Sequence, residues 1–286
     1  MRVIMMLVAL CLITGSLVVA QKSDEATRKL WDTAYIAPAS GKSTARRRSG
    51  HKYRIATPNV PIDNVLPESV VGVTIWRLRP AGRADSGERI IVHDDNAKEY
   101  VPERISANTK LNAGDRVRIS VEAARNGYLY VIDRELYADG TLGEPYLIFP
   151  TTRTLNGDNK VSIGKLAELP AQEDSPPFFT IRRSRPDQVA EMVSVLVTPI
   201  PLEGVEITDK AQKLTEAQVA KWEKSWSNSV GRLEMETMGQ AWTKAEKDAG
   251  TNTRALTSSA PAPQMLFYRP KSSEAMFVKL RLSYRK

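Results

Sequence analysis

A histidine followed by two carboxylates is the feature of the sequence best suited to catalysis. His93, Asp94 and Asp95 are consecutive, and an imidazole beside a carboxylate can act as a general base or, with a metal ion, in hydrolysis. Neither a zinc-ligand spacing nor a Gly-x-Ser-x-Gly motif accompanies them. A polar turn that closes a short strand beginning at Arg89 explains the same residues and is favoured, so an envelope hydrolase is the alternative hypothesis.

Tyrosines and charged residues gather in a second segment, which is a candidate binding surface. Tyrosines on an open sheet face can stack on sugars or peptides, whereas buried tyrosines pack between strands, and packing is the favoured role for most of them. The candidate binding residues are Tyr128, Tyr130, Asp133, Arg134 and Tyr146.

The carboxylates of this segment suggest two further chemistries, and neither has support from spacing. Asp133 and Glu135 share one face of a predicted strand, as a glycosidase pair would. With Asp139 and Glu144 they could surround calcium, but their spacing matches no calcium-binding loop. No phosphate-binding loop or dinucleotide fingerprint is present. The sequence therefore predicts no metal and no cofactor.

The first 20 residues predict export. Arg2 precedes an apolar run that ends in Val18-Val19-Ala20, which suits cleavage before Gln21. The alternative, a retained membrane anchor, is weaker because Thr14, Gly15 and Ser16 interrupt the run. Cys11 is the only cysteine, so we expect a mature chain with no disulfide and no thiolate. The expected location is periplasmic or extracellular, with outer-membrane association as an option.

A basic N-terminal arm is predicted over residues 21–66. The stretch 22–54 has nine Lys and Arg against three Asp and Glu, which accounts for most of the net charge of +8. The arm is a candidate tether to anionic lipid or wall phosphate, or else a solvated linker. Nucleic acid is not expected as a partner, because aromatic residues do not alternate with the basic ones. The candidate tether residues are Arg46, Arg47, Arg48, Lys52 and Arg54.

Alternating apolar residues predict many short strands in residues 67–205. Val117, Ile119 and Val121 alternate with polar residues, and the pairs Asn126-Gly127 and Asp139-Gly140 predict two successive hairpins in a three-stranded meander. The near-continuous apolar run 192–198 predicts a central strand covered on both faces. The expected fold is mainly β, an antiparallel β-sandwich of immunoglobulin-like or jelly-roll-like type.

The apolar period changes from two to 3.6 residues after Leu214, which predicts a helical excursion within residues 206–286. Thr215 and Gln218 form a capping box, and an apolar stripe through Trp222 and Trp226 extends to Leu233. A second short helix is predicted over residues 240–248, and a final strand over residues 275–284 returns to the sandwich.

Short motifs between residues 107 and 202 resemble a bacterial domain family of unknown function, DUF4384. They include Gly127-Tyr-Leu-Tyr, Leu147-Ile-Phe-Pro150 and Val195-Leu-Val-Thr-Pro199, in the order and at spacings suited to that family. The resemblance implies a β-rich accessory or interaction module, often exported or fused to peptidases and kinases. It brings no catalytic residues, and this chain has no recognisable enzyme domain beside it.

The leading functional hypothesis is a noncatalytic envelope protein whose β-sandwich binds protein or glycan. It rests on the predicted signal, the lack of a catalytic constellation and the family resemblance. The expected partner is another envelope protein or a cell-surface polymer, with the basic arm contacting an anionic surface.

Overall fold

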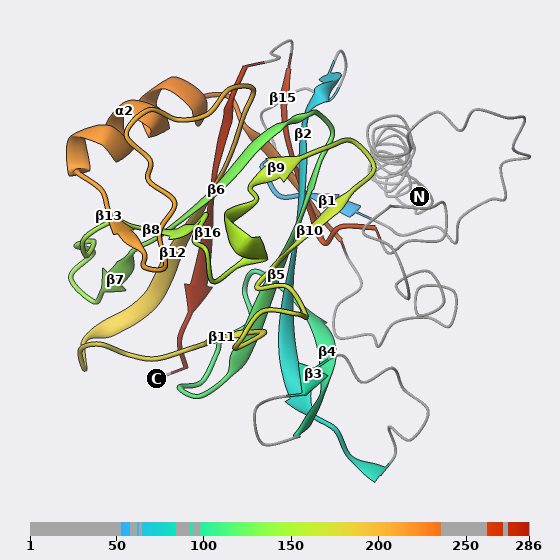
Figure 1. Cartoon of the computed structure of the whole chain (residues 1–286), viewed down its shortest axis with the longest axis vertical. Coiled ribbons are helices and arrows are strands. Elements are labelled where there is room, and N and C mark those ends of the chain that lie inside the picture. Colours follow the sequence, from blue (N-terminus) through green and yellow to red (C-terminus); the bar gives the residue numbers. More distant parts are fainter. Residues whose placement is uncertain are drawn as a thin grey trace, which may run out of the picture.

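The computed structural model describes residues 53–57, 62, 65–83, 92–93, 98–235, 262–270 and 274–285, with backbone alone at 66, 67, 92 and 93. These residues form two antiparallel sheets packed face to face, with helix α2 (Glu216–Trp226) on the outer side of one of them (Figure 1). The predicted β-sandwich with a small helix is therefore confirmed. Within the described ranges, no helix has the length and apolar character needed to cross a membrane.

The first sheet is built around the long strand β2. Val71–Leu78 pairs with β5 on one side, while β15 and β4 share the other side of β2. In the described chain this sheet has nine strands: β1 (Tyr53–Ile55), β2 (Val65–Pro80), β3 (Val92–His93), β4 (Glu99–Ile105), β5 (Arg116–Ala123), β10 (Leu166–Leu169), β11 (Phe179–Thr180), β14 (Gly231–Met235) and β15 (Met265–Pro270).

The second sheet is built around β12, which pairs with β16 on one side and with β6 and β7 on the other. The short 3-10 turn η2 (Leu155–Gly157) lies between β8 and β9 in the chain. The seven described strands of this sheet are β6 (Gly127–Asp133), β7 (Glu135–Tyr137), β8 (Tyr146–Phe149), β9 (Lys160–Val161), β12 (Gln188–Thr198), β13 (Gln212–Lys213) and β16 (Met276–Ser283).

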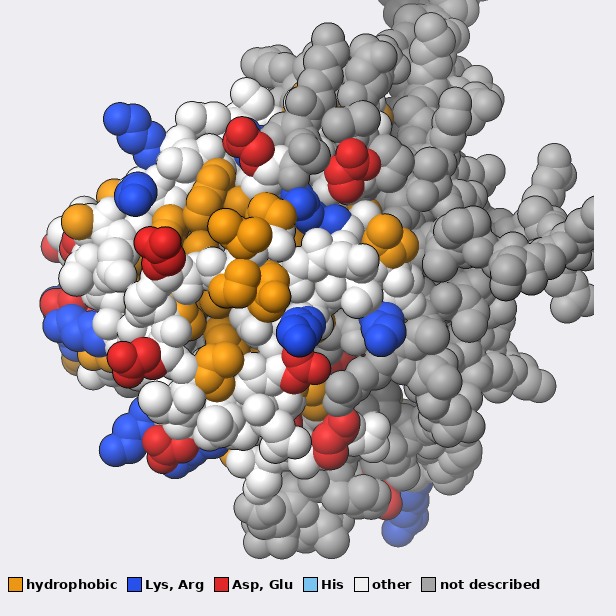
Figure 2. All heavy atoms as spheres, turned by 45° about the horizontal axis from the view of Figure 1, so that its top comes forward, with side chains coloured by type: hydrophobic (Ala, Val, Ile, Leu, Met, Phe, Trp, Pro, Cys, Tyr) orange, Lys and Arg blue, Asp and Glu red, His pale blue; other side chains and the backbone are white. Residues whose placement is uncertain are grey.

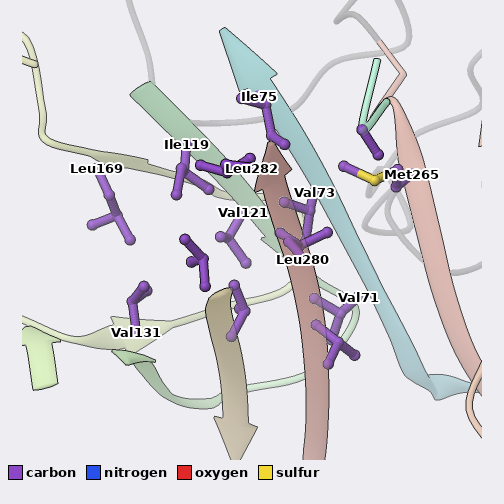
Figure 3. Close-up of a cluster of buried hydrophobic side chains, with 14 of the residues drawn as sticks. Val71, Val73, Ile75, Ile119, Val121, Val131, Leu169, Met265, Leu280 and Leu282 are labelled. Atoms are coloured by element: carbon purple, nitrogen blue, oxygen red, sulfur yellow. The ribbon is translucent and has the colours of Figure 1, made fainter. Parts of the chain in front are cut away.

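The main core fills the space between the two sheets. Every second residue of β2, β5 and β16 points into it, which explains the alternation seen in the sequence (Figure 3). Val73 and Val121 are fully buried, and Leu280 is 1% exposed. Burying side chains of this size stabilises the fold by about 1.5–3 kcal/mol each.

A second core lies between the outer face of the second sheet and helix α2. Tyr130, Leu196 and Phe277 point outward from β6, β12 and β16 and pack against Val219 and Trp222 of the helix. β12 is thus covered on both faces, as its long apolar run predicts. Its Val193, Val195 and Val197 belong to the main core.

Helix α2 begins where the sequence predicts and ends earlier. The Thr215 side chain accepts a hydrogen bond from the Gln218 backbone N–H, and the Gln218 side chain accepts one from the Thr215 backbone N–H, which completes the capping box. The helix ends at Trp226, and Ser229 has a positive φ of 59°. The extension of the apolar stripe to Leu233 is wrong, because that residue lies in β14, where it is the cross-strand partner of Leu266 in β15.

The predicted three-stranded meander is also wrong at its first turn. Asn126-Gly127 connects β5 in one sheet to β6 in the other, so these consecutive strands do not pair. β5 already has β2 on one side and β10 and β11 on the other. Alternation fixes which face of a strand is buried, but it leaves the choice of partner open. The second turn does join an antiparallel pair, because β6 pairs with β8.

Segments at both ends of the chain are part of the sandwich. Within the predicted arm, Tyr53–Ile55 forms β1 and pairs with β14, and Arg54 lies 3.5 Å from Glu234. The predicted final strand is present as β16. The predicted signal segment, Arg46, Arg47, Arg48, Lys52 and the predicted helix at 240–248 lie outside the described residues.

Gly127 carries a steric constraint that predicts a stability effect. A Cβ at this position would lie 2.2 Å from the backbone oxygen of Thr198, so β6 and β12 approach too closely there for any side chain. We expect Gly127→Ala to lower the free energy of unfolding by roughly 2–3 kcal/mol, the upper part of the range for overpacked sites. Urea unfolding followed by tryptophan fluorescence measures the loss.

Gly114→Ala is the matched control, because a Cβ at this position meets no atom within 4 Å. Its positive φ of 92° leaves only backbone strain, which costs about 1–2 kcal/mol. Equal losses in the two variants would contradict the close approach at Gly127.

Candidate functional site: two hollows beside helix α2

Two hollows are lined in part by residues of helix α2. The first, the apolar groove, has a volume of about 740 Å³ and lies between residues 198–204 and one side of α2, from Gln218 to Trp226. Trp222 and Trp226 line its helix side, and Glu274 and Ala275 also contribute to the lining. Figure 2 looks onto this upper part of the molecule and shows hydrophobic side chains gathered among scattered charges.

Contacts within the second sheet hold the apolar groove in shape. The Tyr130 hydroxyl accepts a hydrogen bond of 2.9 Å from the backbone N–H of Leu202, and the Thr198 hydroxyl donates one of 2.6 Å to the Ile200 carbonyl. These bonds fix the loop after β12, so that the Ile200 side chain remains 70% exposed. Exposure of so large an aliphatic residue beside two tryptophans marks a surface able to bind an apolar group.

The second hollow, the polar depression, has a volume of about 590 Å³ and lies at the first residue of α2. β6, β7 and β12 contribute Asp133, Glu135 and Glu191, and Glu135 is the cross-strand partner of Glu191. Tyr137 and Tyr146 form part of the wall. Like charges directly opposite each other on neighbouring strands are destabilising, so this arrangement is not explained by sheet stability.

The two arginines of the polar depression are already engaged by other groups. Arg134 donates a hydrogen bond of 2.8 Å from Nε to the Gly143 carbonyl and pairs with Glu216 of α2. Arg185 makes two hydrogen bonds to Asp187 and lies over the Tyr137 ring, 4.0 Å from its centroid. In the described chain, neither guanidinium pairs with Asp133, Glu135 or Glu191.

Burial and mutual repulsion raise the pKa values of two carboxyl groups in this depression. Burial is the main cause that raises the pKa of Asp133 to about 6, and the neighbouring Glu135 adds to it. Burial first, then the charge of Asp133, raises the pKa of Glu191 to about 8, although hydrogen bonds from Tyr284 and Gln188 act in the opposite direction. At neutral pH Glu191 therefore retains a proton that a solvent-exposed carboxylate would release.

One oxygen of each of these carboxyl groups has no partner. Asp133 Oδ1 and Glu191 Oε2 are closed off from solvent and make no hydrogen bond. The other oxygen of Glu191, Oε1, accepts from the Tyr284 hydroxyl and from Gln188 Nε2 at 2.9 Å. Buried oxygens without a donor are costly, so a proton or a ligand donor would stabilise them.

Three of the five predicted binding residues line a hollow, and the other two pack under α2. Asp133, Arg134 and Tyr146 line the polar depression, and the Tyr146 side chain is 43% exposed. Tyr130 is 2% exposed and lies beneath α2, where its hydroxyl supports the wall of the apolar groove. Tyr128 is half-buried and packs against the same cluster under the helix.

The described residues include only one member of the predicted catalytic group. The backbone of His93 lies in β3 opposite Glu99 of β4, and Asp94 and Asp95 lie outside the described residues. The hydrolase hypothesis therefore stays a prediction without a described geometry.

Sequence reasoning did not find Glu191, Arg185 or Glu216, which the fold brings to the polar depression. Glu191 does leave a signal, because it is a lone charge in the strand Gln188–Thr198, whose other residues are largely apolar. The other two are ordinary surface charges in sequence, and only the packing of α2 and of the β11–β12 connection brings them near Asp133.

The acidic residues do not form a metal centre in the part of the chain that the structure describes. No three His, Cys, Asp or Glu side chains there are placed to hold a metal ion. The calcium arrangement of Asp133, Glu135, Asp139 and Glu144 thus has no support from the described geometry.

Comparison of the chain with protein-family models, curated proteins and solved structures gives no match. The resemblance to the bacterial family DUF4384 stays a prediction.

The raised pKa values predict that stability falls as the pH rises. A carboxyl group whose pKa is higher in the folded chain than in the unfolded chain stabilises the fold fully below the unfolded value, near 4, and this contribution is lost as the pH passes the folded value. For Glu191 the window extends from about pH 4 to about pH 8. Between pH 5 and pH 8, we expect the free energy of unfolding of Glu191→Gln to fall by at least about 1 kcal/mol less than that of the unmodified protein.

Chemical denaturation at pH 5, 6, 7 and 8 measures the difference between the two proteins. Glu206→Gln removes an exposed carboxylate outside both hollows and serves as the control, for which we expect the pH dependence to stay unchanged. A Glu191→Gln curve parallel to that of the unmodified protein would show that Glu191 does not retain a proton.

Proposed function

We propose that the protein is a noncatalytic exported envelope protein whose β-sandwich binds another protein, with an apolar segment of that partner in the groove beside α2. The observation that carries this proposal is the groove itself, which the exposed Ile200 lines together with Trp222 and Trp226. Aromatic and aliphatic side chains around a pre-formed hollow are typical anchors of protein interfaces.

The chemistry of the apolar groove favours a protein segment over a glycan. A sugar needs several hydrogen-bonding groups around its hydroxyls, as well as an aromatic face. Proline and aliphatic residues of the 199–202 loop form one wall, and the polar side chains from α2 are Gln218, Lys221 and Ser225. A partner segment that presents leucine, isoleucine or an aromatic residue would fill this hollow with apolar contacts.

Export and tethering complete the proposal. The predicted signal segment places the protein in the envelope, and the basic residues Arg46, Arg47, Arg48 and Lys52 are proposed to contact an anionic surface there. Arg54 has a different environment, because it follows Tyr53 in β1 and approaches Glu234. The tether is therefore proposed for the residues before β1.

The test is cross-linking from the groove, followed by a measurement of affinity. A photoreactive benzoylphenylalanine in place of Ile200 should cross-link one discrete protein in native envelope fractions. With that protein purified, Ile200→Asp should weaken binding at least about tenfold, because a carboxylate in an apolar interface must lose its water. Calorimetry gives the two dissociation constants.

Ile163 provides the matched control, since it is also a large exposed aliphatic residue, at 43%, and lies outside both hollows. Ile163→Asp should leave the affinity unchanged, and a photoreactive group there should not capture the same protein. Equal effects at the two positions, or binding only to glycans, would overturn the groove as the protein-binding site.

A further inference from the structure

Strand β16 forms a long, regular free edge of the second sheet in the described chain. It is the last strand in the order β13-β8-β6-β12-β16, and it pairs with β12 over eight consecutive residue pairs without a bulge. Among the described strands, β13, β1 and β3 also end a sheet order, and each has only two or three residues. Proteins usually protect sheet edges with short strands, bulges or prolines, and β16 has none of these devices.

The direction of the backbone groups in β16 follows from two hydrogen bonds near its end. The N–H of Tyr284 donates a hydrogen bond of 2.8 Å to the carbonyl of Val189 in β12. The carbonyl of Ser283 accepts one of 2.8 Å from the N–H of Leu111, on the side away from β12. Because neighbouring residues of an antiparallel strand direct their backbone groups to opposite sides, the odd-numbered residues of β16 direct theirs away from β12.

Three residues of β16 therefore offer unpaired backbone groups at this edge. They are Phe277, Lys279 and Arg281, and no hydrogen bond within the described ranges joins their outward N–H and C=O groups to another residue. Leu111 covers only the end of the edge, through its bridge to Tyr284. An extended peptide can pair with such groups and add one strand to the sheet.

The side chains along this edge favour an acidic occupant. Lys279 and Arg281 lie on the outer face of β16 and are exposed, and the Lys279 side chain is still 46% exposed although it pairs with Glu223 of α2. Lys110 and Arg285, beside the bridge at the end of the edge, are also exposed. Opposite charges on neighbouring strands stabilise their pairing, so a segment with Asp or Glu opposite Lys279 and Arg281 fits this edge.

A second copy of the chain fits the edge less well. Two β16 strands paired antiparallel around Leu280 would place Lys279 of each copy opposite Arg281 of the other, and like charges in such pairs are destabilising. Basic side chains of this kind discourage pairing between copies of one protein. They leave the same edge open to a strand of opposite charge.

We propose that the free edge of β16 binds an extended segment of another protein in which acidic and apolar residues alternate. The acidic residues lie opposite Lys279 and Arg281, and the apolar ones lie opposite Val278 and Leu280, whose side chains belong to the main core. The inference goes beyond the apolar groove and does not depend on it, because no residue of β16 lines that groove.

The probe is a fluorescently labelled peptide of sequence Thr-Val-Glu-Val-Glu-Val-Thr, whose binding to the full chain is measured by fluorescence anisotropy. We expect it to bind at least about tenfold more tightly than the same peptide with lysine in place of both glutamates. A version with N-methyl groups on the amides that would pair with β16 should not bind, because it lacks the donors of the new ladder. Equal binding of the acidic and basic peptides, binding of the methylated one, or binding of none would overturn the inference.

Variants of the edge then separate the backbone from the charge. Lys279→Pro removes an outward N–H and leaves the ladder to β12 in place, so it should weaken the acidic peptide at least about tenfold. Lys279→Ala keeps that N–H and should weaken it only about threefold. Equal losses in the two variants would show that the side chain alone binds the peptide and would overturn strand addition. The methylated peptide remains an independent test if Lys279→Pro does not fold.

Two further measurements separate this edge from the other surfaces. Ile200→Asp changes the apolar groove and should leave the affinity for the acidic peptide unchanged. Sedimentation of the full chain tests the competing occupant. A dimer that Lys279→Pro converts to a monomer would show that a second copy covers β16 and would overturn the inference.

Discussion

The structure depends on the burial of β12 on both of its faces. Val193, Val195 and Val197 contribute to the core between the two sheets, while Leu196 points to the other side and needs a second cover. Helix α2 is that cover, and Val219 and Trp222 complete the outer core. Trp222 and Trp226 of this helix also line the apolar groove, so that candidate site follows from the cover of the outer face. Glu191 of the polar depression lies opposite Leu282, on the face of β12 that is turned to the other sheet.

Helix α2 contributes to the two hollows through different contacts. At its N-terminus, Glu216 pairs with Arg134. This guanidinium is therefore engaged by the helix and does not pair with the buried carboxylates. At its C-terminal end, Trp222 is buried and Trp226 is half-buried, so one tryptophan holds the helix in place and the other remains partly available. One helix therefore contributes a charged residue to the polar depression and two tryptophans to the apolar groove.

Local patterns in the sequence predicted the elements of this fold better than their pairing. The capping box at Thr215 and Gln218 and the alternation of β5 and β16 depend on neighbours along the chain, and the structure confirms them. The meander was wrong because Asn126-Gly127 is compatible with a hairpin and equally with a connection between sheets. The partner of β6 is decided by β12, which lies some 60 residues further along the chain.

The candidate sites also depend on strand pairing that local sequence patterns do not determine. Asp133, Arg134 and Tyr146 were found because they cluster in sequence around a turn, whereas Glu191 comes to them through the register of β12 with β7. That register sets Glu191 opposite Glu135, and moving it by one residue would turn the apolar side chains of β12 to the wrong faces. The hydrophobic burial of the strand therefore fixes two like charges against each other. Their repulsion is a consequence of the core, and a proton or a bound cation is the means by which such a cluster is neutralised.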